Sequence, residues 1–394
     1  MTTLRTIAVL GLGRMGGAMA TRLAEQGGNV IGWTRSGRTP DTVTSAADAR
    51  EAVAEADVVL LSLFDGPACR QVVDGMDDSL RPDTVVVNTS TIAPAEAAGL
   101  ARRLGPAYLH APVLGSVPAV AAGTLTLLAA GHQDALDRAR PVLDALGTVR
   151  RVEDPATAAA LKLVTNHSLA AAVVALRDAL HQADALRLPR AQVLDVLALG
   201  RLGALVSGKR PFLTDPPSAC VTTAEFTIGA LGKDMAVLAA ASGTPVRGAA
   251  ALFHSPAGST ADIAAVATVP PVEDAVLEPL RAYIRGHATG DAAHFRDAFL
   301  PSAHIEGVRD GQFVSWDLEE YCSLFSGRPA PDEATRARRI EAVDVHGTVA
   351  TATMTLVHGD QTFTDVLLLV RADGRWRIAN KVYHRRLSSP APSV

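Results

Sequence analysis

Lysine is scarce in this sequence of 394 residues. Lysine and arginine together number 37, and only four of them are lysines, at positions 162, 209, 233 and 381. Codon bias toward arginine is a sufficient cause of this imbalance. A lysine that persists where arginine is the rule can nevertheless mark a place that needs a compact ammonium group with an adjustable pKa. The four lysines are therefore worth following.

Cysteine is almost absent as well. Cys69, Cys220 and Cys322 are isolated, odd in number and without metal-ligand spacing, which predicts reduced thiols and no metal site. The net charge of −4 gives no electrostatic reason to expect nucleic acid or an anionic membrane surface as a partner. Glycine, proline or charge interrupts the apolar runs, and the chain enters a strand almost at once, so we expect neither a membrane span nor a signal peptide. A cytoplasmic protein is the expectation.

The length exceeds the size at which one hydrophobic core stops growing, so two or three domains are expected. The first part alternates helical stretches with short apolar runs at Thr6–Leu10, Asn29–Trp33, Val58–Leu63, Thr84–Asn88, Ala107–His110 and Thr124–Ala129. Such alternation predicts an α/β domain with an open, doubly wound sheet, over residues 1–156. Long helical stretches rich in alanine and leucine follow, and they predict an all-helical domain over residues 157–267.

A third pattern begins after Pro270-Pro271, which indicates a linker over residues 268–271. Two short helices, Glu273–His287 and Ala292–Phe299, come first. Four β-branched runs follow at 340–345, 349–357, 362–370 and 376–383, separated by hairpin signals such as Asp373-Gly374. These features predict an α+β domain over residues 272–386 and a disordered tail over residues 387–394.

The run Gly11-Leu12-Gly13-Arg14-Met15-Gly16 lies between the first predicted strand and a helix predicted from Ala18 to Gln26. This context turns an otherwise weak motif into a dinucleotide-binding fingerprint. Gly11 allows the tight turn, Gly13 lets pyrophosphate approach the backbone, and Gly16 permits close packing of helix on strand. The pyrophosphate then lies at the positive end of the helix dipole.

The residues at the end of the second predicted strand indicate whether the cofactor is NAD or NADP. NAD enzymes usually place an acid there to accept hydrogen bonds from the ribose, but this sequence has Thr34-Arg35-Ser36, with Arg38 close behind. A guanidinium binds a 2′-phosphate in bidentate fashion, and a hydroxyl donates to it. The alternative is that the arginines are ordinary solvated loop residues. The pattern favours NADPH over NADH.

Further motifs follow in a fixed order, and together they resemble the β-hydroxyacid dehydrogenases. They are Asn88-Thr89-Ser90-Thr91, Ala111-Pro112-Val113-Leu114-Gly115-Ser116, Gly123-Thr124-Leu125, Lys162-Leu163-Val164-Thr165-Asn166, and Phe226 with Lys233-Asp234. That family includes 3-hydroxyisobutyrate dehydrogenase, glyoxylate and succinic semialdehyde reductases and, more distantly, imine reductases. The resemblance covers residues 1 to about 267. It implies a Rossmann domain, a long interdomain helix and an all-helical domain that usually dimerises by mutual embrace.

The resemblance also implies roles for single residues. Lys162 is similar to the catalytic lysine and Asn166, one helical turn later, to its partner. An ammonium within hydrogen-bond reach can stabilise and then protonate the oxygen of a carbonyl that receives hydride. The alternative for Lys162 is a snorkelling surface lysine.

Ser90 and the loop Leu114-Gly115-Ser116 resemble the elements that hold a substrate carboxylate, and Thr91 a neighbouring cofactor contact. Many relatives have Ser-Gly-Gly in this loop, so Leu114 removes a hydroxyl and adds apolar bulk, although Ser116 offers a hydroxyl two places later. A small carboxylate substrate is therefore in doubt. Lys233 resembles a family lysine that approaches the cleft, and a structural ion pair is its alternative.

The C-terminal domain resembles the nuclear-transport-factor-2-like cone folds, in particular the SnoaL-like and putative lumazine-binding members. Its two-helix start, Gly290-Asp291 before Phe295, and the closing run Asp373–Lys381 carry this resemblance. Five polar or aromatic residues are candidates for an acid/base set in a cone pocket: His304, Asp310, Trp316, Tyr321 and His384. The alternative is that they rim a cavity in a domain that serves dimerisation.

The sequence as a whole predicts an NADPH-dependent reductase acting on the carbonyl of a small molecule. We expect a homodimer formed through the helical domain, with the cone as a second candidate face. Imine reduction is one alternative, against which Lys162 speaks because many imine reductases replace this lysine. A nucleotide-sensing scaffold without catalysis is another, and the pair Lys162 and Asn166 argues against it.

Overall fold

The computed structural model describes residues 6–214, 224–246, 258–268, 274–309 and 311–387. The chain divides into two compact units, Met1–Val269 and Pro270–Val394. Each unit is described by itself.

The first unit opens with a nine-stranded sheet. Its parallel part has the order β3 (Thr44–Ser45), β2 (Asn29–Trp33), β1 (Thr6–Leu10), β4 (Val58–Leu61), β5 (Val85–Asn88) and β6 (Tyr108–His110). Three further strands extend it: β8 (Leu125–Gly131) runs antiparallel to β6, β7 (Val113–Leu114) antiparallel to β8, and β9 (Gly147–Arg151) parallel to β8. The strand order reverses between β1 and β4, where ligands bind in open α/β sheets.

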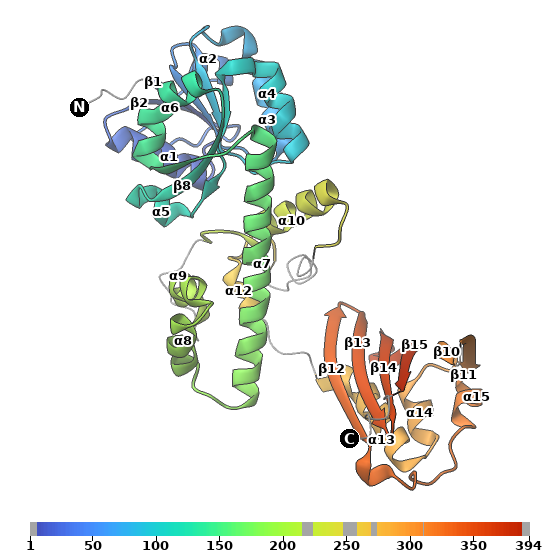
Figure 1. Ribbon diagram of the computed structural model, residues 1–394. Helices are drawn as coiled ribbons and strands as arrows, with labels where there is room; N and C mark the ends of the chain where they lie inside the picture. Colours follow the sequence, from blue (N-terminus) through green and yellow to red (C-terminus); the bar gives the residue numbers. More distant parts are fainter. Residues whose placement is uncertain (1–5, 215–223, 247–257, 269–273, 310, 388–394) are drawn as a thin grey trace, which may run out of the picture. The chain divides into compact units, whose positions relative to one another are not determined.

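Helices cover both faces of this sheet (Figure 1). On one face α1 (Arg14–Glu25), α5 (Val117–Ala122) and α6 (Gln133–Leu146) pack against Ile7 and Val9 of β1. On the other, α2 (Ala49–Val53), α3 (Gly66–Met76) and α4 (Pro94–Leu104) pack against Ala8 and Leu10. Strands buried on both faces need apolar side chains at every position, which explains the continuous apolar runs of β1 and β4. The predicted doubly wound sheet is confirmed.

Helix α7 (Pro155–Ala185) is 31 residues long and leads out of the sheet domain into the helical one (Figure 1). The carboxylate of Asp154 caps it by accepting hydrogen bonds from the backbone N–H groups of Ala156 and Thr157. The helices that accompany it within the described residues are α8 (Arg190–Leu199), α9 (Gly203–Leu213), α10 (Ile228–Ser242) and α12 (Ala264–Ala267). Its buried side chains Ala170 and Val173 pack with α10 and α12, and Leu176 and Leu180 pack with α8 and α9.

The hydropathy of α7 corrects one expectation. A window of this helix has mean hydropathy 1.5, so by length and composition alone it is apolar enough to cross a membrane. The sequence predicts that glycine, proline or charge interrupts every apolar run, and α7 contradicts this prediction. A long core helix passes the same test, so one such helix is weak evidence for a membrane.

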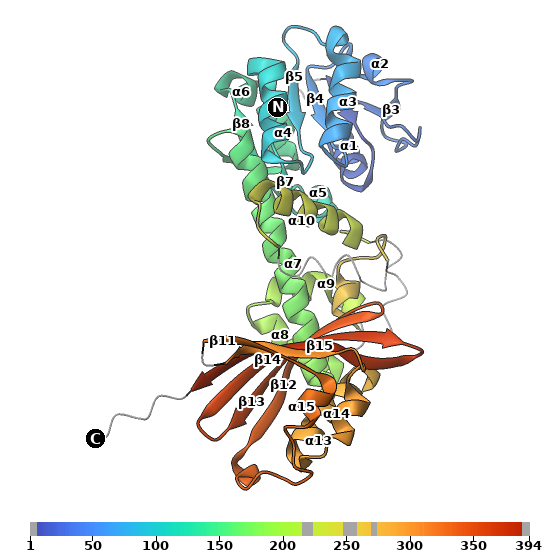
Figure 2. The ribbon, with the colours of Figure 1, turned by 90° about the vertical axis from the view of Figure 1, so that its right-hand side faces the viewer.

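The second unit is a six-stranded sheet with helices packed against one face (Figure 2). The strand order is β11 (Gln312–Asp317), β10 (His304–Arg309), β15 (Arg375–Leu387), β14 (Gln361–Ala372), β13 (Val349–His358) and β12 (Ala337–His346). Helices α13 (Asp274–Thr289), α14 (Ala293–Ala298) and α15 (Leu318–Cys322) supply covering side chains such as Tyr283 and Phe295, and Phe299 follows directly after α14. The predicted α+β cone is confirmed.

Several element boundaries differ from those predicted. Helix α1 begins at Arg14 rather than Ala18, β4 ends at Leu61 rather than Leu63, and β10 and β11 were not predicted. Leu387 belongs to β15 instead of the tail. The rest of the predicted tail and most of the predicted linker lie outside the described residues, as does Cys220. Cys69 and Cys322 are buried free thiols, as expected.

Candidate active site

The glycine turn after β1 fits the shape that a dinucleotide requires. Gly11 has a φ of +96°, and its N–H donates to the carbonyl of Trp33 at 2.8 Å. A Cβ at position 11 would lie 2.4 Å from the carbonyl oxygen of Ser62, and one at position 16 would lie 1.9 Å from that of Gly11. Neither position therefore tolerates a side chain, because backbone atoms that cannot move aside occupy the space.

Gly13 differs from these two glycines because a Cβ there would meet nothing within 4 Å. It lies at the start of α1, whose first N–H groups have no partner within the helix and whose first turn carries no acidic residue. The open space and the positive end of the helix together suit an anion. The residues of this turn thus fit the pyrophosphate of a nicotinamide dinucleotide.

Thr34, Arg35, Ser36 and Arg38 lie in the exposed loop that follows β2. The N–H of Gly37 donates to the carbonyl of Thr34 at 3.0 Å, which closes a turn within this loop. Among the residues that the structure describes, neither the Arg35 nor the Arg38 guanidinium forms an ion pair. Both arginines are therefore available to an anionic group beyond the end of β2.

A cavity of about 960 Å³ lies beside the glycine turn, and most of the predicted site residues line it. Its walls include Gly13, Arg14, Met15, Gly16, Ser90, Thr91, Leu114, Gly115, Ser116, Lys162, Asn166 and Lys233. Gly11 and Leu12 are not among them, and the side chain of Leu12 packs against the sheet core instead. The sheet domain, α7 and α10 all contribute to this one cavity.

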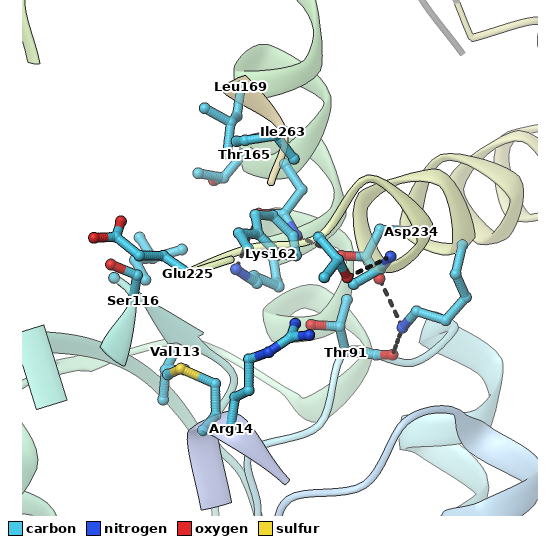
Figure 3. Close-up of a pocket in the computed structure, with 18 of the residues that line it drawn as sticks. Arg14, Thr91, Val113, Ser116, Lys162, Thr165, Leu169, Glu225, Asp234 and Ile263 are labelled. Atoms are coloured by element: carbon cyan, nitrogen blue, oxygen red, sulfur yellow. Dashed lines mark hydrogen bonds and ion pairs between the residues drawn. The ribbon is translucent and has the colours of Figure 1, made fainter. Parts of the chain in front are cut away.

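A chain of hydrogen bonds begins at Lys162. Its Nζ donates to Oδ1 of Asn166 at 2.9 Å, and Nδ2 of Asn166 donates to Oδ2 of Asp234 at 2.6 Å. Asn166 and Asp234 are almost fully buried. Because the Asp234 carboxylate can only accept from the amide, the oxygen of Asn166 must face the lysine. The predicted pair is therefore held in one orientation by a third residue (Figure 3).

Lys233 joins the same network from α10. Its Nζ donates to the carbonyl of Thr91 at 2.8 Å and forms an ion pair of 2.7 Å with Oδ1 of Asp234. Of the two interpretations of Lys233, the ion pair is present, and the side chain also lines the cavity. The hydrogen bond to Thr91 links α10 to the segment that follows β5.

The surroundings of Lys162 change its acidity. Burial lowers the pKa of Lys162 to about 8, because surrounding protein replaces the water that stabilises its charge. The Asp234 carboxylate opposes this shift in pKa, and the Lys233 ammonium adds to it. An amine with a pKa near neutrality exchanges protons readily at the pH of most cells.

Known proteins are similar to this chain in sequence. Residues 6–159 match the family model described as the NAD binding domain of 6-phosphogluconate dehydrogenase. The chain is 35% identical to a probable 3-hydroxyisobutyrate dehydrogenase of Mycobacterium tuberculosis, over 49% of this chain and 68% of the relative. It is also 35% identical to the NAD-dependent L-serine dehydrogenase of Pseudomonas aeruginosa, over 52% and 71%. The chain belongs to the β-hydroxyacid dehydrogenase family.

The solved structures agree. Mycobacterium tuberculosis 3-hydroxyisobutyrate dehydrogenase with L-serine has a TM-score of 0.58 and 27% identity, and the match covers 67% of this chain and 98% of that one. The present chain is therefore an NAD(P)-dependent oxidoreductase with a further domain attached. That domain, over residues 271–384, matches the family model described as putative lumazine-binding. Both predicted resemblances are confirmed.

Ser90 lines the cavity and is held in place by two hydrogen bonds. Oγ of Ser90 accepts a hydrogen bond from the N–H of Leu63 at 2.9 Å, and its own N–H donates to Oδ1 of Asn88 at 2.9 Å. Ser116 and Leu114 line another stretch of the wall. The view in Figure 3 places Ser116 and Glu225 across the cavity from Asp234 and Thr91, with Arg14 reaching in between them.

Several residues of the dehydrogenase site were not in the predicted set. Asp234 belongs to the motif Lys233-Asp234, but the motif alone indicates no role for its carboxylate. Nζ of Lys209, another of the four lysines, lies 2.9 Å from carboxylate oxygens of both Glu225 and Asp262. Since lysine is so rare here, a search for the acidic partner of each lysine is the signal that could have found these residues.

The cone has a smaller cavity of about 140 Å³. Of the five residues predicted for it, Trp316 and Tyr321 line the cavity. His304 and His384 do not: both are exposed, because their positions on β10 and β15 face solvent. Asp310 lies outside the described residues. The two histidines therefore do not belong to the cavity, whereas Trp316 and Tyr321 do.

Proposed function

We propose that the first unit is an NADPH-dependent reductase of a carbonyl group, with Lys162 as the proton donor. The observation that carries this proposal is the position of the Lys162 amine. It lies in the wall of the dinucleotide cavity and donates to the amide of Asn166, and none of the residues that the structure describes places a carboxylate in direct hydrogen-bonding contact with it.

Lys162, Asn166 and Asp234 have separate roles in the proposed reaction. A bound reduced nicotinamide supplies the hydride. As negative charge grows on the carbonyl oxygen, the Lys162 ammonium stabilises that charge and then gives up a proton. Asn166 holds the amine in place, and Asp234 keeps the amide of Asn166 in the only orientation that presents its oxygen to Lys162.

The cavity walls guide the choice of substrate. Leu114 offers no hydroxyl to a carboxylate, which disfavours a very small hydroxy acid as the product. The polar groups that remain on the walls include the Arg14 guanidinium and the Ser116 hydroxyl. We therefore propose an aldehyde, ketone or keto acid with some apolar bulk, in a cavity of about 960 Å³ that has to hold the nicotinamide as well.

The test is consumption of NADPH, followed at its absorbance, with a matched panel of aldehydes, ketones, keto acids and cyclic imines. Turnover of carbonyl compounds with negligible turnover of the imines supports the proposal. Faster turnover of imines would replace it with imine reduction. Binding of NADPH without turnover of any class would favour a nucleotide-sensing scaffold.

The choice of NADPH rests on Arg35 and Arg38. Arg35→Asp replaces attraction with repulsion beside the 2′-phosphate, so NADPH should bind about 10- to 100-fold more weakly while NADH changes little. Arg50→Asp is a matched control, since Arg50 is an exposed arginine on α2 of the same sheet domain. Dissociation constants for both cofactors decide the matter, and a preference of the unaltered protein for NADH would contradict it.

We also propose a homodimer formed through the helical domain. Its surface exposes large apolar side chains at the end of α7 and along α8, with Leu186 70%, Val196 68% and Leu199 89% exposed. A second copy is the partner that would cover such a face. Light scattering should give twice the mass of one chain, and Leu199→Lys should reduce it. A monomer at micromolar concentration would contradict the proposal.

A further inference from the structure

The cone holds a buried polar cluster at the base of its cavity. Tyr283 of α13 donates from its hydroxyl to Oδ2 of Asp365 on β14 at 2.6 Å. Nζ of Lys381 on β15 donates to the Tyr283 oxygen at 2.5 Å and lies 3.0 Å from the same Oδ2. Asp365 and Tyr283 have no exposed surface and Lys381 has 5%, so three polar groups share a site closed to bulk water.

One atom of this cluster is left without a partner. Oδ1 of Asp365 is buried and accepts no hydrogen bond from any residue that the structure describes. Leaving a buried carboxylate oxygen unsatisfied costs the desolvation of a charged acceptor, which folded proteins avoid. Asp365 is among the residues that line the cavity, so a water or a bound molecule in this cavity is the nearest source of a donor for Oδ1.

The walls above the cluster are aromatic. Trp316, Tyr321, Phe325, Phe363 and Tyr383 line the cavity, and the rings of Trp316 and Tyr383 stack with an interplanar angle of 6°. The cavity volume of about 140 Å³ is close to that of an apolar cavity that holds one benzene ring, about 150 Å³. These walls suit a single flat ring packed by its faces and edges.

The charge of the remaining lining completes the description. Lys381 and Asp365 form a pair with no net charge. A neutral hydrogen-bond donor therefore suits the base of the cavity. Arg309 and Arg385 also line the cavity and add positive charge. Arg309 is exposed and, within the part of the chain that the structure describes, forms no ion pair. An anionic substituent on the ring would therefore be favoured on that side.

We infer that the cone cavity is a second ligand site of this protein, for a small one-ring aromatic molecule that carries an O–H or N–H donor and an acidic substituent. The donor binds Oδ1 of Asp365, the ring lies among the aromatic side chains, and the acidic group faces Arg309. This site is separate from the dinucleotide cavity, because each is lined by residues of one unit alone.

Three matched probes test the inference by calorimetry on the full chain with NADPH at saturation. They are 4-hydroxybenzoate, 4-methoxybenzoate, which lacks the donor, and 4-cresol, which lacks the acid. We expect 4-hydroxybenzoate to bind at least tenfold more tightly than 4-methoxybenzoate, since a hydrogen bond to a charged acceptor is lost. Binding of 4-cresol should be weaker than that of 4-hydroxybenzoate and unaffected by Arg309→Leu.

The variant that locates this preference is Asp365→Leu combined with Lys381→Met. It replaces the buried ion pair by apolar groups of similar size and so should still fold. The preference for the hydroxyl over the methoxyl probe should then vanish, with NADPH consumption unchanged. A preference that survives in the double variant, or the absence of any difference between the two probes in the unaltered protein, would show that the cavity holds only water and would overturn the inference.

Discussion

Lys381 is buried and Lys162 is half-buried, and the two units surround these lysines with different partners. Lys162 donates to the neutral amide oxygen of Asn166. The Asp234 carboxylate is connected to Lys162 only through Asn166, whose amide nitrogen donates to it. Lys381 contacts the Asp365 carboxylate directly and lies over the rings of Tyr283, Tyr321 and Tyr383 at 5.0, 5.5 and 5.3 Å. Burial lowers the pKa of both amines, but only Lys381 has a carboxylate and a phenol in direct contact.

The difference separates a proton donor from a structural charge. An ammonium held by a carboxylate is costly to deprotonate, because the loss of its proton leaves a buried anion unpaired. An ammonium held by an amide leaves no such anion in contact with it. The first arrangement suits a fixed cluster that presents Asp365 to a ligand, and the second suits a group that must give up a proton in every turnover.

The largest effect should come from removal of the amine in the dehydrogenase site. Lys162→Ala should lower kcat by about 10²–10⁴-fold, the usual contribution of a positioned general acid, with little change in NADPH affinity. Thermal unfolding should change little, because no buried carboxylate loses a direct partner. Stopped assays with the preferred carbonyl substrate measure the loss.

Lys209→Met provides a matched control for Lys162→Ala. Lys209 lies farther along the same cavity, bound to Glu225 and Asp262, so its loss should affect folding more than proton transfer. Near-normal turnover of Lys162→Ala would remove this lysine from the mechanism.

Substitution of Lys381 in the cone should instead lower stability and leave kcat unchanged. Lys381→Met leaves the Asp365 charge buried without its cation and should destabilise the cone by about 3–5 kcal/mol. The combined change of Lys381→Met and Asp365→Leu should recover part of that loss, because it removes the unpaired charge although the buried Tyr283 hydroxyl still loses both of these partners. Calorimetric unfolding of the full chain measures both variants, and kcat should stay the same throughout. If Lys381→Met is as stable as the unaltered protein, Lys381 does not stabilise a buried charge on Asp365.

A smaller effect should appear in the pH dependence of reduction. Lys162 must be protonated to act as an acid, so kcat should be level at low pH and fall as the pH rises through about 8. Asp234→Asn removes a charge that raises the pKa of Lys162, so the falling limb should move to lower pH. Lys233→Gln removes a charge that lowers this pKa, so the limb should move up. Shifts of about half a unit to one unit are expected, and shifts in the same direction for both variants would contradict the assignment.

The sequence predicted the dehydrogenase unit better than the cone. Glycine positions, the strand–turn–helix order and the helical spacing of Lys162 and Asn166 are local features, and a local pattern survives in the fold. Asp234 is 68 residues from Asn166, so only the tertiary structure brings them together. The hairpin of β10 and β11 was missed although Asp310-Gly311 is a turn signal, since Glu306 and Gly307 interrupt the alternation of the first strand.

Two of the five candidate residues of the cone, His304 and His384, lie outside its cavity for a related physical reason. Histidines were chosen by residue type, but alternation along a strand sends neighbours to opposite faces. On β15 this rule turns Lys381 into the cavity and His384 to solvent. Alternation alone could not have selected Asp365, because β14 is apolar at every position from Val366 to Val370 and only the fold shows which of them are buried.

The smallest expected effect is that of removing the cone altogether. The two units have separate cores, and the division falls at Val269 and Pro270. A chain that ends at Val269 should therefore fold, bind NADPH with unchanged affinity and keep the pH dependence of Lys162, since the hydrogen bonds of Lys162, Asn166, Lys233 and Asp234 all lie within the first unit. It should lose the binding of 4-hydroxybenzoate completely. The comparison needs NADPH titration, steady-state kinetics and mass in solution for both chains. If the shortened chain is insoluble, the units are one folding unit. If it binds NADPH and turns over nothing, the cone supplies a group that the reduction requires, and the separation of the two lysine sites has to be abandoned.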